Sequence, residues 1–168
     1  MPLAFVALQF LAACELVDAV EVAVSGPECG GSGVPDVLKN TDLYIHDWHR
    51  FDWGRIDEGI VLLQPYEHTH NPYIMASLGV LYARKAVTLS DDPTYFRRAA
   101  RLFAWTALCG LGGGAFFLAG LVSEGSGVEK NPELASCLRR AYDANIHDYV
   151  PIAGQVWGCG VRLENFPE

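Results

Sequence analysis

From residue 72 onward, apolar residues recur at the spacing of an amphipathic helix. In the segment 73–85, Ile74, Leu78 and Leu81 fall on one helical face. Three further apolar segments follow, at about 93–109, 115–124 and 132–144. No stretch of useful length alternates with period two, so the pattern predicts an all-α chain of helical hairpins with short loops.

Short polar and glycine-rich stretches mark where these helices begin and end. Ser90-Asp91-Asp92-Pro93 predicts a helix start, because proline suits the first helical position, and Asn131-Pro132 predicts another. The predicted stops are Gly110 with Gly112–Gly114 for the helix 93–109, the turn Gly125-Ser126-Gly127 for the helix 115–124, and Asn145 for the last helix.

The region 41–71 predicts shorter elements that lead into the hairpins. Residues 57–66 predict a helix that Pro65 ends or kinks, and residues 67–72 predict a turn. Before this region, residues 25–40 are rich in glycine and proline and predict a loop.

Residues 1–24 allow two interpretations. The run from Pro2 to Ala13 is almost wholly apolar and too short to span a bilayer, and it resembles the apolar core of a bacterial secretion signal. It ends in Leu11-Ala12-Ala13-Cys14, which resembles a lipobox, the signal after which the cysteine carries a lipid. However, no Lys or Arg precedes the run, and apolar residues continue beyond Cys14, so a core helix is the alternative. A start codon placed too far downstream would explain the missing positive charge.

The net charge of −8 lies entirely in the N-terminal part of the chain. Residues 1–70 hold 11 acidic and 3 basic residues, whereas residues 71–168 hold 9 of each. An acidic half repels phosphate backbones, which argues against nucleic acid as a partner and favours a basic protein surface. Plain solubility is the alternative explanation for this charge.

The two predicted hairpins can be aligned with each other, which indicates an internal repeat. Leu78-Gly79 matches Leu118-Ala119 at an offset of 40, and Ala100 matches Ala135 at an offset of 35. Offsets of this size are typical of stacked helical hairpins. The small residues at these positions are expected to let helix backbones approach closely.

The second hairpin resembles the Sel-one-like repeat (SLR), a relative of the tetratricopeptide repeat. The residues that fit the repeat directly are Ala115, Leu118, Gly125, Gly127, Val128 and Ala135. Ala119, Val122 and Asn131 stand where the repeat usually has glycine, tyrosine and aspartate. The first hairpin keeps Leu78, Gly79 and Tyr82 and then departs, so the resemblance covers about residues 72–145.

The resemblance implies a short solenoid of antiparallel helical hairpins, with irregular caps at 41–71 and 146–168. It also implies an adaptor or scaffold with no catalytic activity and no cofactor. Some exported bacterial members of the family neutralise a delivered toxin, including phospholipase effectors. A generic helical bundle, in which the glycines merely end helices, is the alternative.

An aromatic and acidic cluster in the region 41–71 is the candidate partner-binding surface. Its members are Tyr44, Trp48 and Trp53 with Asp47, Asp52, Asp57 and Glu58. Tyrosine and tryptophan dominate interface hot spots, and the acids suit a basic partner. A cap over the repeat core is the alternative, because Tyr44, Trp48 and Phe51 form a helical stripe.

Patterns that point to catalysis or metal binding are weak. Four histidines, His46, His49, His68 and His70, lie near several acids and suggest a small zinc-dependent hydrolase. Their spacing carries little specificity, and surface polar residues are the alternative. The motifs GxSxG and GxxxxGK are absent from the sequence, and we predict neither a metal nor a cofactor.

The five cysteines form no CxxC pair, so a structural zinc site has little support. Cys109 and Cys137 lie in apolar helices and are predicted to be core thiols. In an oxidising compartment, two disulfides among Cys29, Cys109, Cys137 and Cys159 are the alternative, and their pairing stays open.

The sequence therefore predicts a non-enzymatic module that binds another protein. One form of the hypothesis is a periplasmic protein, lipid-anchored through Cys14, that neutralises a secreted antibacterial effector of the lipase type. In this form the lipid is the protein's one contact with a membrane. The other form is a cytoplasmic adaptor.

Overall fold

The computed structural model describes residues 27–31, 33–39, 41, 52–89, 92–148 and 151–167. These residues form helices and no strand, which confirms the all-α prediction for this part of the chain. The elements are α1 (Asp36–Lys39), η2 (Trp53–Arg55), α2 (Ile56–Leu63), η3 (Gln64–Thr69), α3 (Pro72–Leu89), α4 (Pro93–Leu108), α5 (Gly112–Glu124), α6 (Pro132–Asp148), α7 (Ile152–Gly158) and η4 (Leu163–Asn165). None of the helices in the described residues is long and apolar enough to cross a bilayer.

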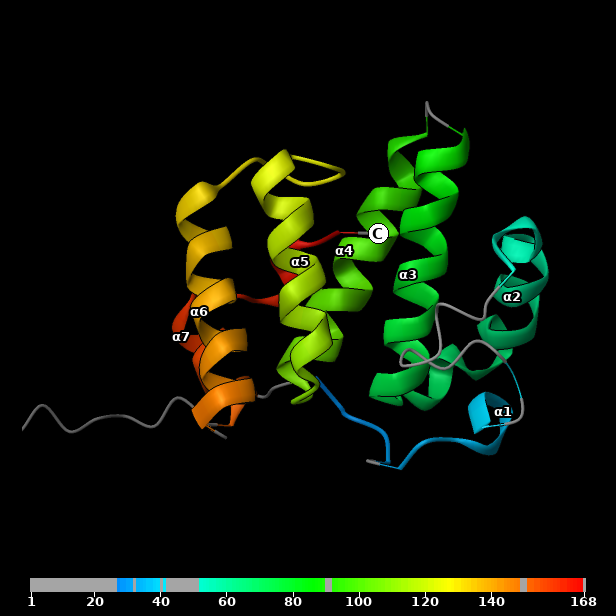
Figure 1. The fold of residues 1–168 in the computed structure, drawn as a ribbon, viewed down its shortest axis with the longest axis horizontal. Coiled ribbons are helices and arrows are strands. Elements are labelled where there is room, and N and C mark those ends of the chain that lie inside the picture. Colours follow the sequence, from blue (N-terminus) through cyan, green and yellow to red (C-terminus); the bar gives the residue numbers. More distant parts are fainter. Residues whose placement is uncertain are drawn as a thin grey trace, which may run out of the picture.

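Helices that follow one another in sequence also pack against one another (Figure 1). α3 packs on α4, α4 on α5, and α5 on α6. α2 packs on α3 at one edge and buries Ile56, Ile60 and Leu63 there. The C-terminal segment returns across the array, because α7 packs on both α6 and α4 and η4 packs on α4.

Two of the predicted helix starts are confirmed by side-chain caps. Asp92 Oδ1 accepts a hydrogen bond from the backbone N of Thr94 at 2.9 Å, and Pro93 occupies the first position of α4. The hydrogen bonds from the side chain and backbone of Thr94 lower the pKa of the Asp92 carboxyl. At the start of α6, Asn131 Oδ1 accepts a hydrogen bond from the backbone N of Leu134 at 2.9 Å.

We expect Asn131→Ala to lower the free energy of unfolding by about 1 kcal/mol, because it removes the acceptor that caps α6. Asn131→Asp keeps an acceptor at the same place and serves as the control. Urea unfolding followed by circular dichroism measures both variants. If the two variants lose the same stability, the cap does not have this role.

Two predicted helix stops are wrong. Gly112–Gly114 form the first turn of α5 and do not end α4. Gly110, at φ 93°, takes part in the reversal between these helices. Asn145 does not end α6, which continues to Asp148. Its side-chain oxygen packs against the start of α5 instead, 2.8 Å from the place where a Cβ on Gly112 would stand.

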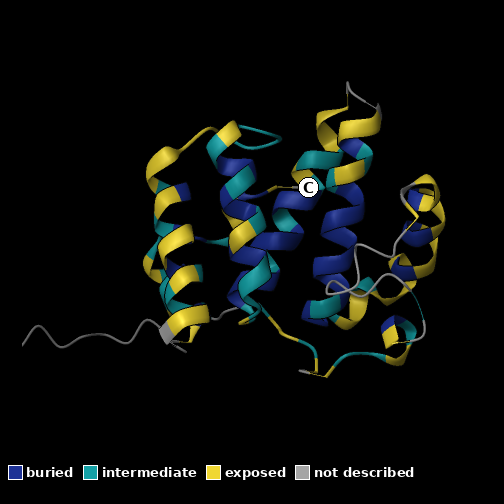
Figure 2. Cartoon of the chain, viewed as in Figure 1, coloured by how far each residue is buried: buried dark blue, intermediate teal, exposed yellow. Residues whose placement is uncertain are grey.

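Most of the core lies between α3, α4, α5 and α6, where the inward-facing helix surfaces are buried (Figure 2), and α1, α2 and α7 also contribute buried residues. It contains seven of the residues that define the repeat: Leu78, Gly79, Tyr82, Ala100, Ala115, Leu118 and Ala135. Gly79 does not bring two backbones together as predicted, because a Cβ there would stand 2.7 Å from the Phe103 ring. Its role is to make room for that ring.

The predicted turn at Gly125–Gly127 is confirmed, and both of its glycines are required by their backbone conformation. Gly125 has φ 79° and Gly127 has φ 70°, a region that side chains other than glycine rarely adopt. A Cβ on Gly127 would also stand 2.5 Å from the backbone N of Arg97. The turn therefore packs directly on α4, and Val128 beside it is packed against the core.

The four cysteines in the described residues form two disulfides, Cys29–Cys109 and Cys137–Cys159. The interpretation of Cys109 and Cys137 as core thiols is therefore wrong. Cys109 directly follows α4, and Cys159 directly follows α7. At these helix ends, Cys109 pairs with Cys29 and Cys159 pairs with Cys137. Cys14, the predicted lipidation site, lies outside the described residues.

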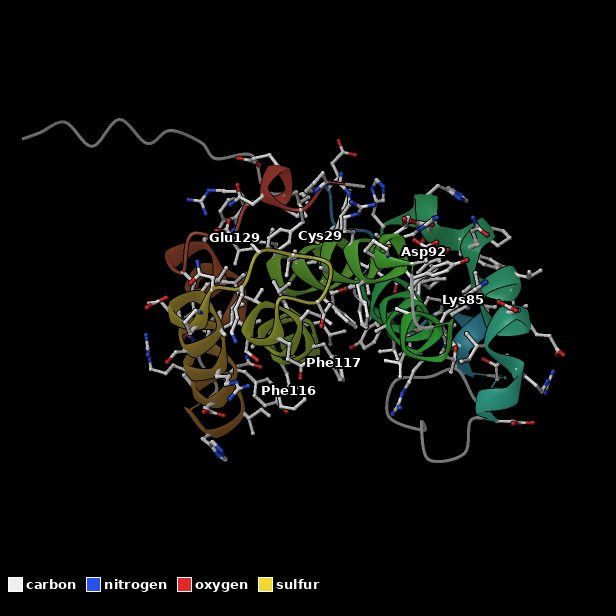
Figure 3. All side chains as sticks on the ribbon, turned by 90° about the horizontal axis from the view of Figure 1, so that it is seen from above. Cys29, Lys85, Asp92, Phe116, Phe117 and Glu129 are labelled. Atoms are coloured by element: carbon white, nitrogen blue, oxygen red, sulfur yellow. A yellow bond between two sulfur atoms is a disulfide. The ribbon has the colours of Figure 1, made fainter. Side chains whose placement is uncertain are left out.

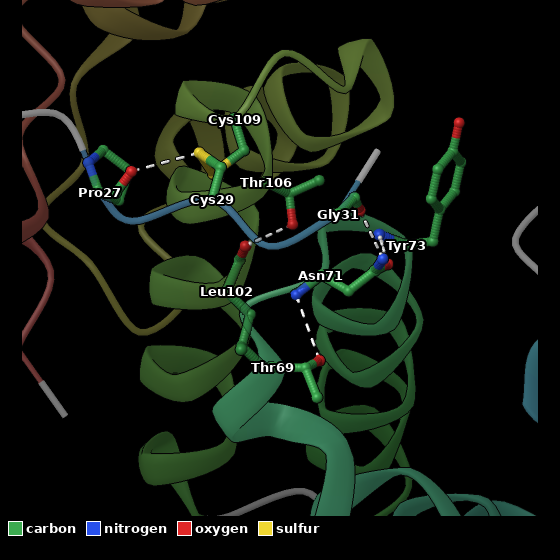
Figure 4. The surroundings of a disulfide bond; sticks show 9 residues. All are labelled: Pro27, Cys29, Gly31, Thr69, Asn71, Tyr73, Leu102, Thr106 and Cys109. Carbon is green, nitrogen blue, oxygen red and sulfur yellow. Dashed lines mark hydrogen bonds between the residues drawn. A yellow bond between two sulfur atoms is a disulfide. The ribbon is translucent and has the colours of Figure 1, made fainter. Parts of the chain in front are cut away.

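Residues 27–31, here called the strap, run across the junction of η3, α3 and α4 (Figure 4). The backbone N of Gly30 donates to the backbone O of His70 at 2.9 Å. Asn71 Nδ2 donates to the backbone O of Gly31 at 2.6 Å and of Gly33 at 3.0 Å. A Cβ on Gly30 would stand 2.0 Å from the backbone O of Thr69, so the strap lies tightly against this junction.

Candidate functional site

A groove of ≈ 620 Å³ is open to solvent between α3, α4, α5 and α6. On α3 it is lined by Val80, Ala83, Arg84 and Val87, which are spaced i, i+3, i+4 and i+7 and so share one face of the helix. Val87 is 62% exposed. This wall of the groove is therefore mainly aliphatic and accessible.

Five aromatic side chains line the groove. Besides Phe96, four of them have neighbouring rings, and we call these four the aromatic row: Phe103, Phe117, Phe116 and Tyr142. The ring centroids of Phe103 and Phe117 lie 5.1 Å apart, and those of Phe117 and Phe116 lie 5.3 Å apart. The Phe116 ring also lies 5.1 Å from that of Tyr142. These separations are typical of favourable aromatic pairs, so neighbouring rings fix one another in place.

The members of the row differ in their exposure to solvent. Phe103 is 1% exposed and belongs to the core, whereas Phe116 is 50% exposed. Figure 3 shows Phe116 and Phe117 on the side of the molecule that faces away from Cys29. An aromatic ring that is half exposed and held by its neighbours is a feature of interaction surfaces.

The rim of the groove carries charges of both signs. Arg84 on α3 and Arg139 on α6 are basic, and Glu124 on α5 and Asp143 on α6 are acidic. The charges therefore cancel around an apolar floor. This distribution fits a ligand that is apolar on one side and carries both kinds of charge at its edges.

Two of the predicted partner-binding acids, Asp57 and Glu58, lie outside the groove and have local partners. Asp57 Oδ1 accepts a hydrogen bond from Lys85 Nζ at 2.6 Å, which joins α2 to α3 and raises the pKa of Lys85. Glu58 pairs with Arg55 at 2.6 Å. Asp57 therefore links α2 to α3, whereas the pair of Arg55 and Glu58 is a local, exposed contact within three residues.

The other members of the predicted cluster are only partly described. Asp52 caps η2 by accepting a hydrogen bond from the backbone N of Gly54 at 2.9 Å. Trp53 is the first residue of η2. Tyr44, Asp47 and Trp48 lie outside the described residues, so their predicted role stays a prediction.

The predicted histidine group is not assembled in the part of the chain that the structure describes. His68 Nδ1 lies 2.8 Å from the backbone O of Pro65, and the His70 ring lies 4.4 Å from that of Trp105. Within this part, no three His, Cys, Asp or Glu side chains are placed to hold a metal ion. His46 and His49 lie outside it.

The aromatic row was missed in the sequence, although a signal for it exists. Phe116 and Phe117 are consecutive in a helix, so they are turned by about 100° from each other, and one of them is easily left out of the core. Tyr142 lies six residues before the end of α6, on the side that meets α5. Phe116, Phe117 and Tyr142 form one surface only because α5 packs against α6.

The described residues thus form an all-α protein of helices packed one on the next, with an open and largely apolar groove. Comparison of the chain with family models, with curated proteins and with solved structures finds no match.

Proposed function

We propose that this protein is a non-enzymatic binding module that holds an amphipathic helix of a partner protein in the groove. The observation that carries the proposal is the aromatic row, in which the Phe116 ring is 50% exposed in an open groove. A ring in this position loses its contact with water when a partner covers it, and this burial favours association.

A helix is the occupant that best matches the shape and charge of the groove. Helices bound in grooves present apolar anchors at i, i+3, i+4 and i+7 and place polar residues on either side. The groove has an apolar floor and a rim with two basic and two acidic residues. A partner helix with an apolar stripe and charges of both signs beside it complements this arrangement.

We further propose that α3–α4 and α5–α6 are two units of an SLR-type solenoid, and that the groove is its concave face. The burial of the small and apolar repeat positions supports this architecture. So does the packing of each helix on the next one in sequence. The acidic residues of the N-terminal part support a partner with a basic surface next to its apolar helix.

The two disulfides support an oxidising compartment, because disulfides are rare in cytosolic proteins. In the proposal the protein acts in the bacterial periplasm, anchored by a lipid on Cys14, and neutralises a secreted lipase-type effector. A cytoplasmic adaptor is the competing version, and the disulfides favour it less.

Site-specific photocrosslinking tests the groove directly. A photoreactive phenylalanine analogue at position 116 is compared with the same analogue at position 61, because Val61 on α2 is an equally apolar residue that is 71% exposed outside the groove. We expect position 116, and not position 61, to crosslink to one segment of one protein. That segment should be an amphipathic helix with a mixed-charge border.

The synthetic segment should then bind the purified protein saturably. We expect Phe116→Ala to weaken this binding by about tenfold or more, which is the size of a hot-spot effect, and Val61→Ala to leave it unchanged. Equal binding to Phe116→Ala and to the unaltered protein would overturn the proposal.

A further inference from the structure

A second cavity lies on the other side of α4, between this helix and η3. It has a volume of ≈ 300 Å³, and its polar lining is Glu67, His68, His70, Thr94, Arg98 and Arg101. Met75, Leu102 and Trp105 supply its apolar wall. A cavity of this size holds a small molecule and is too small for a polypeptide helix.

The spacing of residues along α4 separates this cavity from the groove. Thr94, Arg98, Arg101 and Trp105 follow one another at i, i+4, i+7 and i+11, so they form one stripe of the helix. Phe96 and Phe103, which line the groove, lie seven residues apart on another stripe. The same helix therefore presents an apolar face to the groove and a basic, mixed face to the cavity.

The charge of the cavity is opposite to that of the whole chain. Its lining contains two arginines and one glutamate, a net charge of +1, whereas the chain carries −8. Arg98 and Glu67 form an ion pair at 2.8 Å, in which one guanidinium nitrogen of Arg98 is used. A guanidinium has five N–H donors, so this contact leaves most of its capacity to donate hydrogen bonds.

Both arginines are held in place by the surrounding fold. The guanidinium of Arg98 lies over the Tyr82 ring, with its Cζ 4.6 Å from the ring centroid. Arg101 donates hydrogen bonds to the backbone O of Leu163 at 3.3 Å and of Phe166 at 2.8 Å. Donors that are fixed before a ligand arrives lose less conformational entropy when they bind it.

The His70 wall of the cavity is fixed as well. His70 is the one described residue other than glycine with a positive φ, at 52°, a conformation that is costly unless the surroundings enforce it. Two backbone hydrogen bonds hold His70, which is the C-cap of η3. Its backbone N donates to the backbone O of Glu67 at 3.0 Å, and the backbone N of Gly30 in the strap donates to the backbone O of His70 at 2.9 Å. The His70 ring lies 4.4 Å from the Trp105 ring at an interplanar angle of 40°, so the two rings together form one aromatic side of the cavity.

We propose that this cavity binds a small organic anion, either a carboxylate or a phosphate monoester, whose planar or apolar part lies against Trp105. The arginines suit both anions, because a guanidinium fork matches the oxygen geometry of carboxylate and phosphate. The net positive charge disfavours cations, and the apolar wall distinguishes the ligand from a bare inorganic ion. This site is independent of the proposed helix-binding groove.

The test uses the full chain with its disulfides intact and three probes: phenyl phosphate, benzoate and inorganic phosphate. Titration followed by NMR reports on the wall directly through the indole N–H signal of Trp105, assigned by its loss in Trp105→Phe. We expect saturable shifts of this signal with phenyl phosphate or benzoate. Whichever of these two probes binds more tightly identifies the class of anion. Inorganic phosphate should bind at least about tenfold more weakly than that probe.

Two adjacent arginines provide a matched pair of variants for calorimetric titration. Arg98→Gln should lower the affinity for the more tightly bound probe by about tenfold or more. Arg97→Gln removes the same charge one residue away, outside the cavity lining, and should change this affinity by less than about twofold. Arg98→Lys, which keeps the charge beside Glu67 and Tyr82, should retain the fold and still lose affinity. Equal losses in Arg97→Gln and Arg98→Gln, or a Trp105 signal that does not move in the unaltered protein, would overturn the proposal.

Discussion

Gly114→Ala is expected to destabilise the protein by about 3 kcal/mol, because Gly114 lies where the backbone of α5 is in close contact with that of α4. A Cβ at this position would stand 2.6 Å from the backbone N of Ala107 and 2.7 Å from the backbone O of Phe103. Both are main-chain atoms of a packed helix and cannot turn aside as a flexible side chain does. The two helices would have to separate, and the core between them would lose packing.

Gly120→Ala is the matched control in the same helix. No atom lies within 4 Å of the place where a Cβ on Gly120 would stand. Alanine is favoured over glycine inside a helix, so this variant should be more stable by about 0.5 to 1 kcal/mol. Urea unfolding should show a lower free energy of unfolding for Gly114→Ala and a higher one for Gly120→Ala. A Gly114→Ala variant as stable as the unaltered protein would show that α4 and α5 are not packed as closely as described.

Local signals explain which features of the fold were predictable. The starts at Asp92-Pro93 and at Asn131 were predicted because a cap and the backbone N–H that it binds lie within three residues. The end of α6 and the start of α5 were not predicted. Both depend on contacts between helices, in which Gly114 meets α4 and Asn145 meets the first turn of α5.

The candidate site was less predictable than the fold. The aromatic and acidic residues of region 41–71 predicted a partner-binding surface. In the structure, Asp52 caps a helix and Asp57 and Glu58 form ion pairs. The groove is made by four helices, and α5 is apolar on almost every side. A helix without a polar face gives no indication of which aromatic residue is left exposed, so Phe116 could be identified only from the packing of α5 on α6.

The strap shows the same dependence on distant contacts. Cys29 and Cys109 are 80 residues apart, and their pairing was one of several that the sequence left open. The pairing follows from the packing of the strap against the end of α4. The tethered strap then supplies one of the two backbone hydrogen bonds that hold His70, and the other is the local C-cap bond to the backbone O of Glu67.

Replacing both members of the Cys29–Cys109 disulfide with serine is expected to lower the free energy of unfolding by about 4 kcal/mol, because the bond closes a loop of 80 residues in the unfolded chain. The Cys137–Cys159 disulfide closes a loop of 22 residues, so its removal should cost less, about 3 kcal/mol. Urea unfolding of both double variants, at the same protein concentration, measures the difference.

The two double variants are controls for each other, since each removes two sulfurs and one loop constraint. Treatment of the unaltered protein with a reducing agent should lower its stability at least as much as either pair of substitutions. An unaltered protein whose unfolding midpoint does not respond to reduction would contradict a contribution from either bond. A larger loss from Cys137 and Cys159 than from Cys29 and Cys109 would mean that contacts in the folded state outweigh loop length.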